Sequence, residues 1–281
     1  MSEPSQAKLL INLDRYPIGS IEDLNTPEGK TFTEKCAKTY RETGLCALPE
    51  FVVPKALTQL SQEAQLATKD AYFCNNTHNA YLTDSASNSD QNDVHKRLEK
   101  TFVGSVPYDK IQQSDLNQLY LFDPLKEFIR RVLGKEKLYR FADPLGACSI
   151  NVFVDGGCHG WHFDESEFTV TLMLQAPTRG GHFEYAPGIR GNENEARLLE
   201  ETLDGSRDQV VELPFTPGTL LIFAGQQTLH RVTAVTGPKP RLVPVLCYAE
   251  EPDLKNSAEV RTLFWGRTAE EHLVTGTSHE A

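Results

Sequence analysis

Residues 160–168 have the sequence GWHFDESEF, and this stretch decides the fold that we predict for the chain. His162 and Asp164 stand two positions apart, directly after a run that is typical of a β-strand. Side chains two positions apart in an extended segment project to the same side, so both can reach one ion. The stretch therefore predicts a strand whose end presents two metal ligands, although a turn that merely happens to carry a His and an acid has the same local pattern.

A third ligand candidate lies in another strand-like run, LHRVTAV at residues 229–235. In a jelly roll, this strand can return beside the one that ends at His162, which would bring His230 to the same place. Two imidazoles and one carboxylate on one side of a divalent ion leave three adjacent coordination positions open. A closed site of four cysteines would leave none.

Arg241 opens the strand-like run that follows, RLVPVLCY. A guanidinium inside a barrel matches a carboxylate with two parallel hydrogen bonds, whereas an unpaired cation is costly there. Arg241 is therefore the candidate for binding an anionic co-substrate, with a structural ion pair as the alternative. Arg231 is the weaker candidate because, next to His230 in a strand, it points to the opposite face.

The surrounding sequence favours a mainly β fold with flanking helices. Eight short runs rich in Val, Ile, Phe, Thr and Leu recur between turn signals, and their sequences are KLYRFA, CSINVFV, FTVTLML, GGHFEYA, QVVELPF, GTLLIFA, LHRVTAV and RLVPVLCY. Such spacing predicts a β-sandwich or a jelly roll rather than alternating β and α units. The acidic, helix-prone residues 191–208 are predicted to form an insertion between two of the strands.

Residues 1–136 are predicted to form a helical preface and a lid. We expect a helix at 31–43, a strand in LCALPEF (45–51), a helix from Pro54 to about Thr68, and a helix at 115–133 that Pro124 bends. The polar stretch 71–110 is interpreted as a loop and candidate lid. With residues 251–281 as a C-terminal extension, the prediction is a single domain over residues 1–281.

Charge and composition exclude several classes of partner. The chain has 28 Lys and Arg against 39 Asp and Glu, a net charge of −11, which disfavours nucleic acid. No apolar run approaches the roughly 20 residues that span a bilayer, so we expect no membrane contact and a cytoplasmic protein. The six widely spaced cysteines are expected to be reduced thiols, and a zinc site at Cys158 with His159 or His162 is the minor alternative.

These motifs resemble those of the iron(II)/2-oxoglutarate-dependent dioxygenase superfamily. The resemblance rests on HFD (162–164), His230, Arg241 and the turn TPGTLLIFAG (216–225), and covers roughly residues 137–250. It implies that these residues form a double-stranded β-helix, that is a jelly-roll, cupin-like core. HGWHFDE (159–165), HNAYLTD (78–84) and LFWGRT (263–268) further resemble the branch of free amino acid hydroxylases and halogenases. In the halogenases of that branch Gly replaces the carboxylate ligand and admits chloride, so Asp164 favours hydroxylation.

The resemblance implies a set of cofactors and a reaction. Fe(II) would be held by His162, Asp164 and His230, the distal carboxylate of 2-oxoglutarate would pair with Arg241, and O2 would be the oxidant. The expected reaction hydroxylates an unactivated C–H bond of a small polar substrate, a free amino acid or a derivative, and releases succinate and carbon dioxide. The residues implied to contact substrate are His159, Glu165, Trp265, Asn79 and Tyr81.

Other interpretations stay open at this point. The substrate could be a peptide or a natural-product intermediate that undergoes hydroxylation, desaturation or ring closure, or the chain could be a metal-binding cupin without oxygen chemistry. Each residue implied to contact substrate could instead have a purely structural role, such as packing in the case of Trp265. His78, His95 and His182 are expected to have no part in the site.

Overall fold

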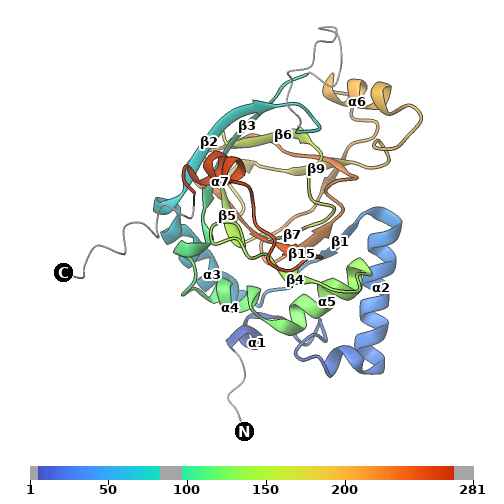
Figure 1. Cartoon of the computed structure of the whole chain (residues 1–281), viewed down its shortest axis with the longest axis vertical. Coiled ribbons are helices and arrows are strands. Elements are labelled where there is room, and N and C mark those ends of the chain that lie inside the picture. The colour runs from blue at the N-terminus through green and yellow to red at the C-terminus, as the bar shows by residue number, and fades with distance from the viewer. Residues whose placement is uncertain (1–5, 83–96, 269–281) are drawn as a thin grey trace, which may run out of the picture.

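The strands of the computed structural model form one large curled sheet, and most of the helices lie along one side of it (Figure 1). The structure describes residues 6–82 and 97–268. The helices are α1 (Gln6–Leu10), α2 (Pro27–Thr43), α3 (Pro54–Ala67), α4 (Asp115–Tyr120), α5 (Asp123–Leu133), α6 (Glu195–Leu203) and α7 (Ala258–Trp265), with 3-10 turns at Asp23–Asn25, Thr68–Asp70 and Tyr108–Lys110.

All eight predicted strand-like runs contain strands in the structure. The strands are β1 (Leu45–Leu48), β2 (Tyr72–His78), β3 (Glu99–Val106), β4 (Tyr139–Arg140), β5 (Cys148–Phe153), β6 (Cys158–His162), β7 (Thr169–Leu172), β8 (Arg179–Gly180), β9 (Phe183–Ala186), β10 (Val211–Leu213), β11 (Leu220–Phe223), β12 (Leu229–Val232), β13 (Val235–Thr236), β14 (Arg241–Leu246) and β15 (Tyr248–Ala249). The predicted insertion is also confirmed, since α6 lies between β9 and β10.

The order of the strands in the sheet shows how the fold is wound. One half runs β1-β11-β7-β14-β5, the other runs β6-β12-β9-β10, and β3 joins them by pairing with both β5 and β6. From β5 onward the chain passes repeatedly from one half to the other. The two halves face each other, because the rings of Phe183 on β9 and Phe223 on β11 lie 5.3 Å apart. The predicted double-stranded β-helix core with flanking helices is confirmed.

The main hydrophobic core lies between the first half of the sheet and helices α2 to α5 (Figure 1). Along β5, Cys148, Ile150 and Val152 belong to this core. Because side chains alternate along a strand, the residues between them face the interior enclosed by the two halves. Helices thus cover one face of this half of the sheet, and the other face lines the interior in which a functional site can lie.

The predicted helix over residues 115–133 is two helices. Ser114 caps α4 by accepting a hydrogen bond from the Asn117 N–H, as expected, but α4 ends at Tyr120 and α5 begins at Asp123. Pro124 stands in the first turn of α5, where its missing N–H costs nothing, whereas inside a helix its ring would clash with the preceding turn. A proline expected to bend one helix therefore begins a second. Helix α2 also begins earlier than predicted, at Pro27.

The interpretation of residues 71–110 as a loop is wrong for most of the residues that the structure describes there. Residues 72–78 and 99–106 form the antiparallel pair β2 and β3, and β3 completes the sheet between its two halves. Of the residues in β2, only Cys74 is buried, so this strand lacks the alternating apolar pattern that would have revealed it. The rest of the candidate lid, residues 83–96, lies outside the described residues, and so does His95.

Within the described ranges, no helix combines the length and the apolar character needed to cross a membrane. The expected cytoplasmic location stays a prediction. So does the division into a preface (1–136), a core (137–250) and an extension (251–281).

Asp143 fastens the C-terminal helix to the core. One carboxylate oxygen accepts hydrogen bonds from the N–H groups of Leu145 and Gly146, and the other accepts them from Asn256 N–H and Arg261 Nε. Asp143 and Arg261 are both buried. Burial alone would raise the pKa of Asp143, but the bonds from Arg261 and the backbone hold it below its usual value.

Replacing Asp143 should therefore be costly. Asp143→Ala leaves the Arg261 charge buried without its partner, and we expect a loss of about 3–5 kcal/mol in the free energy of unfolding, measured by urea denaturation at pH 7. Because the folded pKa is depressed, this stabilisation is present above the ordinary Asp pKa of about 4 and is lost as the pH falls through the folded value.

The matched control is Glu201→Ala, which breaks the exposed Arg197–Glu201 pair on α6. That change should cost no more than about 1 kcal/mol. Equal losses for the two variants would contradict the role given to Asp143.

Candidate metal centre

The three predicted metal ligands meet where β6 and β12 pair. His162 is the last residue of β6, and the antiparallel register places it directly opposite His230 on β12, with ring centroids 4.2 Å apart. Asp164 follows two residues later, and its N–H donates to the Gly225 carbonyl at 3.0 Å. Two segments nearly 70 positions apart in sequence thus converge through ordinary sheet pairing.

The orientation of the two imidazoles suits metal binding. His162 Nδ1 lies 2.7 Å from the Gly160 carbonyl and His230 Nδ1 lies 2.8 Å from the Thr228 carbonyl. Since a carbonyl can only accept, each Nδ1 carries a proton, and Nε2 is the nitrogen of each ring that is left to bind a metal. Asp164 Oδ1 lies 3.4 Å from both Nε2 atoms. Three ligand atoms therefore surround one point.

The electrostatics of this group match its geometry. Burial, reinforced by the neighbouring His230, lowers the pKa of His162 to about 4, so its imidazole is neutral at pH 7. Burial would raise the pKa of Asp164, but His230 and His162 hold it well below its usual value. Two neutral imidazoles and one carboxylate neutralise half the charge of a divalent ion, which stays attractive to an anionic ligand.

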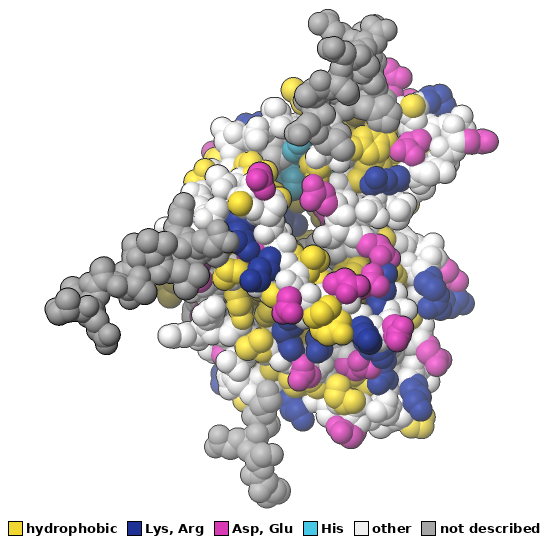
Figure 2. Space-filling view, viewed as in Figure 1, with side chains coloured by type: hydrophobic (Ala, Val, Ile, Leu, Met, Phe, Trp, Pro, Cys, Tyr) yellow, Lys and Arg dark blue, Asp and Glu magenta, His cyan; other side chains and the backbone are white. Residues whose placement is uncertain are grey.

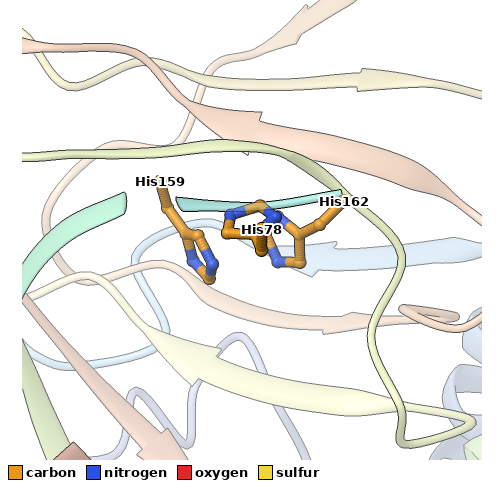
Figure 3. A group of neighbouring side chains, drawn as sticks. All are labelled: His78, His159 and His162. Atoms are coloured by element: carbon orange, nitrogen blue, oxygen red, sulfur yellow. The ribbon is translucent and has the colours of Figure 1, made fainter. Parts of the chain in front are cut away.

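A second group of histidines lies beside the first and was missed by the sequence analysis. Figure 3 shows His78, His159 and His162 gathered on one side of β6. The His159 ring stacks on His162 at 3.8 Å, and the His78 ring meets both edge-on at 5.4 and 5.6 Å. Only the motif HNAYLTD hinted at His78, because its place depends on the hairpin of β2 and β3.

The two groups compete for His162, because its Nδ1 is engaged and only Nε2 can bind a metal. In the all-histidine group both nitrogens of His78 have partners: Nδ1 lies 3.0 Å from the Asn79 carbonyl and Nε2 lies 2.7 Å from Thr101 Oγ1. That group also lacks a carboxylate to offset the charge of the ion. The group with Asp164 and His230 is therefore the better candidate.

Arg241 is buried in the same interior without an anionic partner. It opens β14, is 2% exposed, and its guanidinium carbon lies 5.2 Å from the Phe153 ring centroid and 5.7 Å from that of Phe215. Its Nε has no hydrogen-bond partner, and no acidic group of the described ranges pairs with it. Burial lowers its pKa to about 9, so it stays cationic at pH 7. A buried cation of this kind calls for an anionic ligand.

The space-filling view shows how this interior opens to the surface. In Figure 2 histidine side chains are visible beside a hollow near the middle of the face, and the Asp164 side chain is 20% exposed. Glu165, directly after the three-residue HFD motif, is exposed. The candidate centre is thus reachable from one side.

The residues Asn79 and Tyr81, predicted to contact substrate, also have structural contacts. Asn79 is buried and its Oδ1 accepts a hydrogen bond from the Tyr81 N–H. Tyr81 donates its hydroxyl to Glu195 of α6 and packs its ring 5.3 Å from that of Phe163. These contacts join the insertion to the motif that carries the ligands, while contact with substrate stays a prediction.

Trp265 and Arg231 both have structural contacts, and contact of Trp265 with substrate stays a prediction. Trp265 is 8% exposed, packs against Gly146, and has an indole N–H without a partner. Arg231 forms an ion pair with Glu184 and lies over the Trp161 ring, so it faces away from His230 as expected. Cys158 Sγ lies 3.6 Å from the Lys100 carbonyl and belongs to neither metal-capable group of the described part of the chain.

The family model for Halogenase D matches residues 29–265, which is most of the chain. The chain belongs to the Halogenase D family. No curated protein sequence matches it.

Solved structures share the fold at low sequence identity. The epimerase SnoN from nogalamycin biosynthesis, in complex with Fe3+, alpha ketoglutarate and nogalamycin RO, is 14% identical with a TM-score of 0.54, covering 78% of this chain and 84% of SnoN. A 2OG-Fe(II) oxygenase family oxidoreductase from Burkholderia pseudomallei is 16% identical with a TM-score of 0.50, covering 79% and 92%.

A prolyl hydroxylase from Trichoplax adhaerens, bound to a peptide fragment of hypoxia inducible factor, is 14% identical with a TM-score of 0.50, covering 80% of this chain and 92% of the hydroxylase. These likenesses confirm the predicted fold. Together with the family, they confirm the predicted iron(II)/2-oxoglutarate-dependent oxygenase superfamily.

A comparison of variants would separate the two metal-capable groups. Asp164→Ala and His230→Ala should weaken Co(II) binding, measured by calorimetry, by more than the roughly 10–100-fold typical of losing an outer partner. His78→Ala should weaken it far less, because His78 is not a ligand of the preferred group. Exposed His182→Ala is the control. Loss of binding in His78→Ala with retention in His230→Ala would reverse the choice.

Proposed function

We propose that this chain is an iron(II)- and 2-oxoglutarate-dependent oxygenase in which His162, Asp164 and His230 hold the iron. The observation that carries the proposal is the position of Asp164 Oδ1, 3.4 Å from both free Nε2 atoms at the end of a paired strand. The donor set is the two imidazoles and one carboxylate that suit ferrous iron with open positions.

Arg241 is the proposed site for the distal carboxylate of 2-oxoglutarate. Its buried guanidinium lacks an anionic partner among the described residues, and a carboxylate would satisfy both its charge and its orphaned Nε. When bound, iron and 2-oxoglutarate would together activate O2, which is the oxidant, and 2-oxoglutarate would give up two electrons as it is converted to succinate and carbon dioxide. The chain's own task is to hold both in a buried interior and to place one substrate bond beside them.

We propose hydroxylation, although the family is named for halogenation. In the halogenases that the sequence resembles, Gly stands at the carboxylate position and leaves room for chloride. Here Asp164 fills that position, and its carboxylate is charged and directed at the two imidazoles. A negatively charged ligand at this place excludes a chloride ion both sterically and by repulsion.

A free amino acid or a derivative is the proposed substrate. His159 stacks on the ligand His162, and burial together with its histidine neighbours lowers its pKa well below the usual value, which makes it a neutral hydrogen-bonding group. Glu165 presents an exposed carboxylate just after the ligands, suitable for an ammonium group. The partnerless indole N–H of Trp265 is a further donor.

A second candidate is an oxygenase that acts on a larger molecule. It is favoured by the likeness to SnoN, whose complex contains nogalamycin RO, and to the prolyl hydroxylase with its peptide. A metal-binding cupin without oxygen chemistry is the third, and the unpaired Arg241 argues against it because such a protein has no need of a buried cation.

Arg241→Ala should raise the KM for 2-oxoglutarate roughly 10–100-fold, the value of one lost charge-assisted pair, while Co(II) affinity is retained. Arg241→Lys should recover only part of this because it lacks the two-pronged geometry. The exposed Arg179→Ala is the control. An unchanged KM in Arg241→Ala would show that 2-oxoglutarate binds elsewhere.

Substrate-dependent succinate formation tests the function itself. The iron-loaded protein, supplied with 2-oxoglutarate and air, should form succinate with at least one free amino acid of a broad panel, and the product should be heavier by one oxygen atom. Asp164→Ala should abolish this product, since it loses a metal ligand.

Each other outcome of the panel excludes the first candidate. Activity only with peptides or natural-product intermediates would select the second. If the protein bound metal but consumed no 2-oxoglutarate, with or without a candidate substrate, the result would select the cupin.

A further inference from the structure

Asp164 is held through both of its carboxylate oxygens. Oδ1 faces the two imidazoles, whereas Oδ2 accepts a hydrogen bond of 2.6 Å from Thr169 Oγ1. Thr169 opens β7 and is paired with Phe223 at the end of β11, so the sheet itself fixes its position. One oxygen of the ligand is thereby engaged before any metal arrives.

Gly225 lies against the other side of the same carboxylate. A Cβ added to Gly225 would overlap Asp164 Oδ2 and would lie 2.7 Å from Cγ and 2.9 Å from Cβ of Asp164, and these three are its nearest atoms. The φ angle of Gly225 is not in the left-handed region, so φ does not by itself require glycine here. Asp164 is therefore the nearest obstacle to a side chain at position 225.

The two segments cannot easily move apart to admit a larger side chain. Asp164 N–H donates to the Gly225 carbonyl at 3.0 Å, and Gln226 Nε2 donates to the Glu165 carbonyl at 3.2 Å. Arg190 adds a third tie, since its Nη1 donates to the Gln226 carbonyl at 2.6 Å while its guanidinium lies over the Phe163 ring. The backbone on each side of the ligand is thus fastened to the backbone around Gly225.

We infer that Thr169 and Gly225 are positioning residues that keep Asp164 a single-oxygen ligand. This inference rests on the proposed function, because it concerns the metal that Asp164 would bind. Oδ1 lies toward the two Nε2 atoms, whereas Oδ2 lies against Thr169 and Gly225, so the ion would meet Oδ1. One more coordination position then stays open than with a two-oxygen carboxylate. The hydroxylase-type centre therefore depends on three residues, one of which must lack a side chain.

The role of Gly225 can be tested in metal-free protein by a double-mutant cycle. Gly225→Ala should lower the Tm by roughly 5 °C in the wild-type background, the usual effect of overpacking in a chain of this size. In the Asp164→Gly background the same change should have almost no effect, because the overlapping carboxylate is absent. Equal losses in both backgrounds would overturn the inference for Gly225.

The role of Thr169 is tested with Co(II), whose visible absorption reports coordination number. Thr169→Val keeps the shape and removes the hydroxyl, so it should change the Co(II) spectrum and weaken binding by about 10–100-fold. Thr169→Ser retains the hydroxyl and should restore both. A wild-type spectrum and affinity in Thr169→Val would overturn the inference for Thr169.

The two experiments also separate this inference from the proposed function. If the wild-type protein bound neither Co(II) nor iron, the proposed function and the coordination role of Thr169 would fail together. The double-mutant cycle in metal-free protein would still show whether the cost of Gly225→Ala depends on the Asp164 side chain.

Discussion

The pairing of β6 with β12 is the constraint on which the candidate centre depends. It places His162 opposite His230, and the turn after β6 then carries Asp164 to the same point. Because side chains alternate along a strand, a slip of one residue in this register would turn one histidine away from the other. The curled sheet and its cover of helices hold that register, and β3 locks β6 to the opposite half.

The sequence was most informative where chemistry and strand periodicity coincide. His162, Asp164, His230 and Arg241 stand out because few structural roles need these residue types at the start or end of apolar runs, and the structure brings them into one interior. The β2–β3 hairpin was missed because its strands are polar and only weakly alternating. His78 was missed with it, since its position beside His159 depends on a pairing that the pattern did not reveal.

Thr169 and Gly225 show a different limit of sequence analysis. Gly225 ends the turn TPGTLLIFAG and Thr169 lies in the run FTVTLML, but the contact of each with Asp164 exists only after three strands have assembled. The family name indicates halogenation, whereas our proposal of hydroxylation rests on the carboxylate at position 164. Fold and family define the scaffold, and individual side chains at the metal decide the reaction.

The most direct measurement is a crystal structure of the protein grown without oxygen in the presence of Fe(II) and 2-oxoglutarate. The account predicts one iron bound by His162, His230 and a single oxygen of Asp164, with the distal carboxylate of 2-oxoglutarate on Arg241. An iron held by His78 and His159, or 2-oxoglutarate bound away from Arg241, would contradict it.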